Sequence, residues 1–251
     1  MRKVILDVMT MSGRCLRMSF RNIEALGEVA VTPLLMVILF IYLLGSGAYD
    51  IQTYINTQVP SVILLTLGFS SFYTGYGVNN DMKRGIIDRF RSMPLFQPAV
   101  LAGHVASSLV RSFVTVAVVI GSTIVIGFRP QAGMLDWLII LGILFLSVLM
   151  TTWISILIGL TAKTSESVAS LGAFVQFMPF LSAGFTAPEN LITPLRVFFT
   201  YQPFTPIINA IRGLTMGAGD KNDIIVAVIW CVVLMLVFYV LSMRIYNRKA
   251  Q

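Results

Sequence analysis

Long apolar stretches alternate with short polar ones along almost the whole of this 251-residue chain. A helix needs roughly 20 apolar residues to cross a hydrocarbon core of about 30 Å. Six stretches approach or exceed that length, and we expect them to span a membrane: residues 29–47, 59–78, 100–128, 137–160, 167–185 and 224–243. The pattern therefore predicts an all-α integral membrane protein with six transmembrane helices.

The first 28 residues follow a different pattern, in which basic side chains interleave with apolar ones. Such interleaving is typical of an amphipathic helix that lies at a membrane surface. We therefore divide the chain into an amphipathic interface helix, residues 1–28, and a six-span transmembrane domain, residues 29–251.

A second irregular region, residues 186–223, lies between the fifth and sixth spans. It keeps many apolar and aromatic residues but is interrupted by Pro188, Pro194, Pro203 and Pro206. Proline removes a backbone donor and breaks a helix, so an uninterrupted span is excluded here. We expect two short helices broken around residues 202–206, partly embedded in the membrane as a re-entrant segment.

The composition and the placement of charge agree with a membrane protein. Hydrophobic residues make up 57% of the chain and charged residues 12%, against about 25% charged residues in a soluble domain. With six spans, one side of the membrane receives the basic residues Arg2, Lys3, Arg14, Arg17, Arg21, Lys83, Arg84, Arg89, Arg91, Lys163, Arg244, Arg248 and Lys249. The other side receives only Arg129, Arg196, Arg212 and Lys221. This bias predicts that the termini and the segment 81–94 are cytoplasmic, and it explains the net charge of +7 without nucleic acid.

One basic residue falls inside a predicted span. Arg111 belongs to the third span, and we expect its side chain to snorkel toward the nearer membrane surface.

The densest charge lies between the second and third spans, at residues 81–94. If this stretch is helical, Asp81 is placed to cap its N-terminus, Arg84 pairs with Asp88, and Pro94 ends it. An apolar stripe then forms from Met82, Ile86, Phe90 and Met93. The stretch therefore predicts a short basic amphipathic helix on the cytoplasmic side.

Candidate chemistry is sparse. Ser70 and Ser71 in the second span and His104 in the third supply the residue types of a nucleophile and a base, but small hydroxyl residues in membrane helices more often serve packing. The sequence has no Gly-x-x-x-x-Gly-Lys-Ser/Thr phosphate loop, which excludes ATP hydrolysis by that route. Cys15 and Cys231 lie far apart and no His/Cys cluster occurs, so we expect no catalytic site and no bound metal or cofactor.

Several motifs in order along the chain resemble one family. The stretch from Arg84 to Pro94, followed by Pro98–Gly103, is similar to the first cytoplasmic loop of daunorubicin-resistance-type permeases of ATP-binding-cassette exporters. Further matching stretches are Gly127-Phe-Arg-Pro130, Phe180–Phe185, Gln202-Pro-Phe-Thr-Pro206 and Ala210–Leu214. The chain departs from the family pattern at Ser182-Ala-Gly-Phe185, where an asparagine is common, and at Phe96-Gln97, where a basic residue is common.

The resemblance implies a permease subunit that pairs with a second permease chain, identical or homologous, and with two ABC ATPase subunits that bind ATP and Mg. It implies outward transport of a hydrophobic or amphipathic molecule such as a drug, a lipid or a secondary metabolite, across the plasma membrane of a prokaryote. The helix after the second span would be the coupling helix that contacts the ATPase. Its residues here would be Arg84, Gly85, Asp88, Arg89, Phe90, Arg91, Ser92 and Pro94.

Aromatic residues of the second and fifth spans would line the pathway of such a dimer, and residues 186–223 would cover it from outside. The candidates on the second span are Phe69, Phe72, Tyr73 and Tyr76, facing Phe174, Phe177, Met178 and Phe185. Plain interhelical packing explains any one of them equally well, and residues 186–223 also suit a lipid-facing re-entrant loop. The alternative function is an ATP-independent carrier or scaffold whose helix 81–94 lies on anionic lipid.

Overall fold

The computed structural model describes residues 2–21, 23–86 and 98–249, and its regular elements in these ranges are all helical. The elements are α1 (Arg2–Arg21), α2 (Ile23–Val37), η1 (Ile38–Leu43), η2 (Gly45–Gly47), α3 (Ile51–Lys83), α5 (Ala99–Ile126), α6 (Met134–Thr161), α7 (Ser165–Phe177), η3 (Pro188–Asn190), α8 (Thr193–Tyr201), α9 (Phe204–Thr215) and α10 (Lys221–Arg248). The predicted all-α class is confirmed for this part of the chain.

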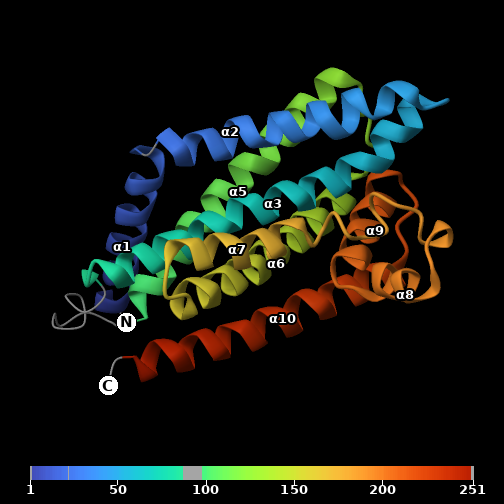
Figure 1. The fold of residues 1–251 in the computed structure, drawn as a ribbon. Coiled ribbons are helices and arrows are strands. Elements are labelled where there is room, and N and C mark those ends of the chain that lie inside the picture. Colours follow the sequence, from blue (N-terminus) through green and yellow to red (C-terminus); the bar gives the residue numbers. More distant parts are fainter. Residues whose placement is uncertain (1, 22, 87–97, 250–251) are drawn as a thin grey trace.

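The long helices run lengthwise through the molecule, and the short ones gather at its two ends. Figure 1 shows α3, α6, α7 and α10 side by side, with α8 and α9 at the end opposite the two termini. α3 packs against α5, α6 and α7, and α10 packs against α6 and α9. α1 packs on α5 near the termini. Of the predicted interface helix, residues 2–21 form α1 and residues 23–28 belong to α2.

Five described helical segments are long and apolar enough to cross a membrane: Val29–Gly47, Ile51–Lys83, Ala99–Ile126, Met134–Thr161 and Lys221–Arg248. They correspond to five of the six predicted spans. The predicted fifth span is α7, whose 13 helical residues extend only about 20 Å. Its helix ends at Phe177 because Pro179 lacks a backbone N–H and the chain continues as turns.

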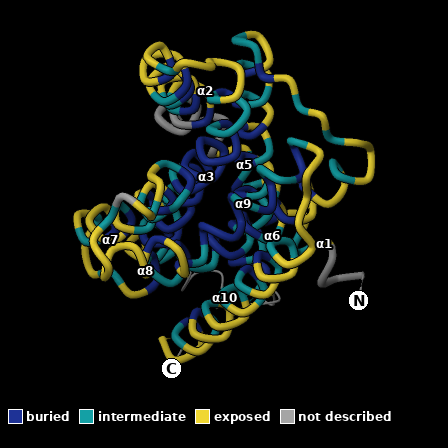
Figure 2. Tube along the Cα trace, turned by 90° about the vertical axis from the view of Figure 1, so that its right-hand side faces the viewer, coloured by how far each residue is buried: buried dark blue, intermediate teal, exposed yellow. Residues whose placement is uncertain are grey.

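α3 is longer at both ends than the sequence pattern predicted. Its N-terminus is capped by Asp50, whose carboxylate accepts hydrogen bonds from the backbone N–H groups of Gln52 (3.1 Å) and Thr53 (3.2 Å). Its other end continues through Asp81 to Lys83. The second span is therefore the central helix of the fold, and Figure 2 shows it as mostly buried while α2 and α10 are largely exposed.

Two glycines set the distance between α3 and α6. A Cβ atom added to Gly75 would lie 2.5 Å from the carbonyl oxygen of Ser155, and one added to Gly159 would lie 2.3 Å from the carbonyl oxygen of Gly75. Real Cβ atoms do not approach backbone oxygens so closely, so only glycine permits this contact between the two backbones.

The region between α7 and α10 contains two short helices, α8 and α9, which separate at Gln202–Pro203 as the prolines predicted. α9 is joined to α3 through Arg212, which donates hydrogen bonds to the carbonyl oxygens of Thr57 (3.0 Å) and Gly184 (3.1 Å). These helices therefore close the end of the bundle away from the termini.

Candidate functional site

Segments far apart in the sequence meet at the end of the bundle that carries the termini. Lys83 at the end of α3 donates a hydrogen bond to the hydroxyl of Ser165 at the start of α7 (3.0 Å). Lys249, just after α10, donates to the carbonyl oxygen of Leu160 in α6 (2.6 Å). These bonds join α3 to α7 and α10 to α6 at the end of the molecule where α3 ends and α5 begins (Figure 1).

A buried ionic cluster lies at the centre of this end. Asp81 is 1% exposed. One carboxylate oxygen accepts a bond from Arg14 Nη2, and the other accepts from Arg14 Nη1, both at 3.1 Å. His104 Nε2 lies 3.1 Å from Asp81 Oδ2. The cluster joins α1, α3 and α5 at the last turn of α3.

The expectation that Asp81 caps a separate helix is wrong. Its carboxylate is paired with Arg14 and His104, and its backbone belongs to the last turn of α3. The physical reason is that two basic side chains from other helices compensate the carboxylate, which removes the need for a solvent-exposed capping position.

Only the first two of the predicted coupling residues lie among the described ones. The backbone N–H of Arg84 donates to the carbonyl oxygen of Asn80 and closes α3. Gly85 follows with a φ of +63°, the left-handed conformation that commonly ends a helix. The other predicted coupling residues, Asp88, Arg89, Phe90, Arg91, Ser92 and Pro94, lie outside the described residues.

Arg111 does not snorkel as expected. It is 5% exposed, and it lies twelve residues into α5, about 18 Å from Ala99 at 1.5 Å per residue. Its Nη2 atom donates hydrogen bonds to the hydroxyl of Thr74 (2.7 Å) and the carbonyl oxygen of Ser70 (3.2 Å). The guanidinium also lies 5.7 Å from the ring centroid of Tyr73. These partners on α3 hold the charge inside the bundle.

Hydroxyl pairs join α3, α5 and α6 along the rest of their interface. Ser71 pairs with Thr151 at 2.7 Å, and Ser108 pairs with Thr152 at 2.7 Å. Ser70 pairs with Ser112 at 3.1 Å. These pairs explain why the second span carries hydroxyl residues, because such side chains form hydrogen bonds across a helix interface.

These pairs also bear on the residues considered for hydrolysis. Ser70 and Ser71 contact hydroxyl side chains of other helices, whereas His104 contacts Asp81. The histidine and the two serines are thus held in separate contacts, unlike a nucleophile and its general base.

The predicted pathway residues make several different contacts. Phe69 on α3 and Phe177 on α7 meet edge to face, with ring centroids 5.7 Å apart. Phe72 packs against the backbone at Gly172, also between α3 and α7. Phe69 and Phe72 therefore pack between α3 and α7, and their part in a pathway stays a prediction.

The other predicted pathway residues have different neighbours. Tyr73 and Tyr76 pair with each other at 6.3 Å. Phe185 instead packs on Phe40, with centroids 4.9 Å apart, and Met178 packs against the apolar core. Phe174 projects outward with 65% exposure.

Comparison with known proteins assigns a family to this arrangement. The model of the ABC-2 type transporter family matches residues 7–216, which is most of the chain from α1 to α9. This chain belongs to the ABC-2 type transporter family. The motif resemblance to permeases of this kind is thereby confirmed.

Two curated relatives extend the comparison of this ABC-2 family member. It is 29% identical over 237 residues to a daunorubicin resistance ABC transporter permease protein of Streptomyces coeruleorubidus, covering 92% of this chain and 83% of the relative. It is 24% identical over 217 residues to a protein of Mycobacterium tuberculosis strain CDC 1551 that is named as a doxorubicin resistance ABC transporter permease. That match covers 83% of this chain and 76% of the relative.

The features of this ABC-2 chain that sequence reasoning missed are its buried charges. Arg14 and Asp81 looked like parts of two surface segments, and Arg111 like a residue near a membrane edge. A usable signal was present for Asp81, because it follows Val78 and Asn79 without a Gly or Pro that would end the second span. The pairing with Arg14 gave no such signal, since the two residues are 67 positions apart.

Proposed function

We propose that this chain is the permease subunit of an ABC exporter that moves a hydrophobic or amphipathic molecule outward. The observation that carries the proposal is the family match across residues 7–216. The names of the two relatives, which refer to resistance to daunorubicin and doxorubicin, support a drug-like or lipid-like cargo and outward transport. The energy would come from hydrolysis of ATP, which a separate ATPase chain would bind together with Mg.

The contact with the ATPase would be made by the segment after α3. This segment is anchored at its start, because Asp81 fixes the last turn of α3 to α1 and α5 through Arg14 and His104. α3 in turn packs on α5, α6 and α7. A displacement of residues 84–94 by nucleotide binding would therefore move the central helix of the bundle rather than a loose loop.

The described helix ends on either side of this segment support the proposed orientation. The start of α1, the end of α3, the start of α5, the α6–α7 turn and the end of α10 share one end of the molecule (Figure 1). The sequence assigns the thirteen basic residues counted above to these same segments, which supports a cytoplasmic position for this end in a prokaryotic plasma membrane. There it would meet two ATPase subunits.

A second permease chain would face the outer side of α7. Leu171, Phe174 and Phe177 of α7 are exposed by 52%, 65% and 51%, and Phe180 in the turns after α7 is exposed by 40%. Phe177 also packs on Phe69 of α3, so this surface is continuous with the proposed pathway aromatics. α7 and the turns that follow it would complete the fifth of six spans. Helices α8 and α9 would form the re-entrant cover on the outer side.

The proposal is tested at the coupling segment by charge reversal. In the variant Arg89→Glu/Arg91→Glu, we expect the ATPase encoded with this permease to be lost from affinity-purified complexes, together with permease-stimulated ATP hydrolysis. The physical reason is that exposed interface charges set register and partner choice, and like charges brought together oppose docking. Folding is checked by the yield and elution volume of the permease.

The matched control is Arg244→Glu/Arg248→Glu. It makes the same change of charge on the same end of the molecule, at exposed positions of α10. We expect this variant to retain the ATPase. Normal copurification and ATP turnover in the first variant, or equal loss in both variants, would contradict the proposed coupling role of residues 84–94.

A further inference from the structure

A cavity of about 950 Å³ lies between α8, α9 and α10, at the end of the molecule away from the termini (Figure 1). α9 packs against both α8 and α10 and forms the floor between them. α8 and α10 each line the cavity with positions that recur at helical spacing: 193, 196, 197, 200 and 201 on α8, and 222, 223, 226 and 230 on α10. Ligand pockets in proteins measure about 300–1,000 Å³, so the cavity has room for a small molecule or a lipid headgroup.

The α8 wall of the cavity suits an anionic group. Arg196 lines the cavity together with Thr193, one turn before it on the same face of the helix. Both side chains belong to exposed residues. A guanidinium stays ionised, and its planar fork matches two oxygens of a phosphate. This wall can therefore hold a phosphate group.

The α10 wall suits a cationic group. Asp223 and Trp230 are seven residues apart and both line the cavity, so they share one face of α10, with Val226 between them. Asp223 and Trp230 are both half-buried. A carboxylate pairs with an ammonium group, and the face of an indole ring attracts the same group through its quadrupole.

The charges around the cavity balance. The other charged lining residues are Glu189 on η3 and Arg212 on α9, so the lining carries two acidic and two basic side chains. All four belong to the described part of the chain, and within it no ion pair joins any two of them. A ligand of a single sign would be attracted by one wall and repelled by the other. A ligand with both signs can pair with each wall at once.

We propose that this cavity binds the headgroup of a zwitterionic phospholipid, with the phosphate toward α8 and the ammonium group toward α10. The hydrocarbon chains would follow α10, where Val226, Ile229 and Val233 are exposed by 42%, 55% and 48%. These residues recur every three or four positions and form an apolar stripe that begins in the cavity at Val226. A free phosphoethanolamine has the same headgroup chemistry but gains nothing from the stripe.

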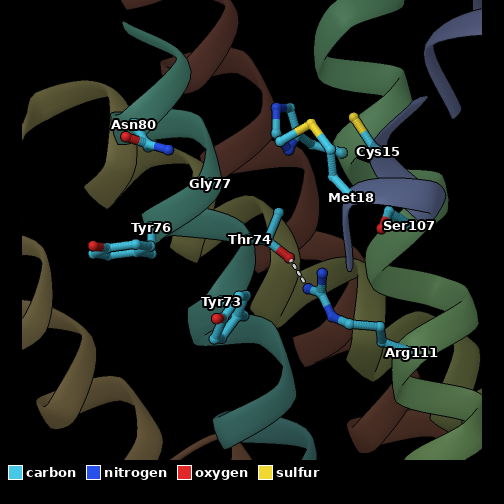
Figure 3. A pocket seen from close by; sticks show the side chains of 10 residues that line it. Cys15, Met18, Tyr73, Thr74, Tyr76, Gly77, Asn80, Ser107 and Arg111 are labelled. Atoms are coloured by element: carbon cyan, nitrogen blue, oxygen red, sulfur yellow. Dashed lines mark hydrogen bonds between the residues drawn. The ribbon is translucent and has the colours of Figure 1, made fainter. Parts of the chain in front are cut away.

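A smaller cavity, of about 100 Å³, lies between α1, α3 and α5 and also has an arginine in its wall. Figure 3 shows this residue, Arg111, directed at Thr74 of α3, to whose hydroxyl it donates a hydrogen bond of 2.7 Å. That charge serves the contact between α5 and α3. Arg196, by contrast, is exposed on a short surface helix. The outer cavity is therefore the one that offers an accessible cation to a ligand.

The binding does not depend on the proposed export function. The lipid site lies at α8 and α10, whereas the coupling proposal concerns residues 84–94 at the other end of the bundle. The test therefore uses the permease alone, without an ATPase. Its failure would leave the coupling proposal intact, and failure of the coupling proposal would leave the lipid site intact.

The test measures lipid adducts on the purified full-length permease in a nonionic detergent by native mass spectrometry. The probes share two oleoyl chains and differ in the headgroup: phosphatidylethanolamine is zwitterionic, phosphatidylglycerol is anionic, and a trimethylammonium lipid is cationic. Free phosphoethanolamine is added as a competitor. We expect one phosphatidylethanolamine per chain, bound at least about tenfold more tightly than either singly charged lipid.

Two variants separate the walls. Arg196→Gln and Asp223→Asn should each weaken phosphatidylethanolamine binding about fivefold to tenfold, because each removes one charge-assisted contact. They should also shift selectivity in opposite directions, since Arg196→Gln favours the cationic lipid and Asp223→Asn the anionic one. A merely structural role would not produce opposite shifts. Neither residue is fully buried, so we expect both variants to fold.

The matched controls are Lys221→Gln at the start of α10 and Asp50→Asn at the start of α3. Each removes one exposed charge from a residue that does not line the cavity, and asparagine still caps α3 in the second. Both should bind phosphatidylethanolamine as the wild type does.

Displacement of the lipid by phosphoethanolamine would support the site and identify the free headgroup as a second source of its ligand. Lack of displacement would support the site and assign it to the lipid. The proposal is overturned if either singly charged lipid binds the wild type as tightly as phosphatidylethanolamine does. It is also overturned if Arg196→Gln or Asp223→Asn binds as the wild type does, if both shift selectivity in the same direction, or if a control loses as much affinity as its matched variant.

Discussion

The ionic cluster at Asp81 offers the sharpest test of how the bundle is held together. The variant Asp81→Asn keeps the size of the side chain and one acceptor oxygen but removes the negative charge. Arg14 and His104 then face a neutral amide in a position that is almost inaccessible to water, since Asp81 is 1% exposed. We expect the free energy of unfolding to fall.

The magnitude follows from the contacts. Removing one partner of a buried ion pair costs about 3–5 kcal/mol. The amide of the Asp81→Asn variant would keep part of the hydrogen bonding, so we expect a loss in the free energy of unfolding at the lower end of this range, about 3 kcal/mol. The side chain of Arg14 is 24% exposed, so we expect a smaller loss of about 2 kcal/mol for Arg14→Gln. In the double variant each change removes the same interaction. Its destabilisation should therefore fall short of the sum by about 2 kcal/mol.

The assay is equilibrium unfolding in mixed micelles with increasing dodecyl sulfate, followed by tryptophan fluorescence and circular dichroism. Asp220→Asn is the control, because Asp220 is an exposed N-cap of α10 and asparagine caps equally well. Destabilisations of Arg14→Gln and Asp81→Asn that add within about 0.5 kcal/mol would refute the pairing. A coupling near the ~0.6 kcal/mol average of membrane hydrogen bonds would also show that the pair is no stronger than an ordinary one.

Two further predictions concern packing and reactivity. Gly75→Ala should destabilise the fold by about 1–3 kcal/mol in the same assay, because its Cβ would lie 2.5 Å from the carbonyl oxygen of Ser155. The control Gly142→Ala, whose Cβ would meet nothing within 4 Å, should be neutral or stabilising by up to about 1 kcal/mol. Similar losses of stability in both variants would contradict the close contact. In a Cys231→Ser background, the rate of alkylation of Cys15 by a maleimide should rise about tenfold per pH unit from pH 8 to 10. The reason is that the pKa of the Cys15 thiol is raised to about 11, so the thiolate is still the minor form in this pH range. A rate that levels off near pH 9 would contradict the raised pKa.

The order and approximate position of the spans were readable from the sequence. Hydropathy is a sum over neighbouring residues, and at most spans that sum is large enough to settle membrane insertion whatever the rest of the chain does. The break between α8 and α9 was readable for a similar reason, since Pro203 and Pro206 act on their own backbone.

The roles of the charged residues were decided only by the tertiary structure. Asp81 looked like the start of an exposed helix, and Arg111 like a side chain reaching for the membrane surface. Both are buried because partners on other helices compensate them: Arg14 and His104 for Asp81, and the α3 groups around Tyr73 for Arg111. Such compensation depends on which faces of distant helices meet. Because an unpaired charge in a membrane is costly, the sequence implies that each buried charge has a partner. Only the packing of the bundle determines which residue that partner is.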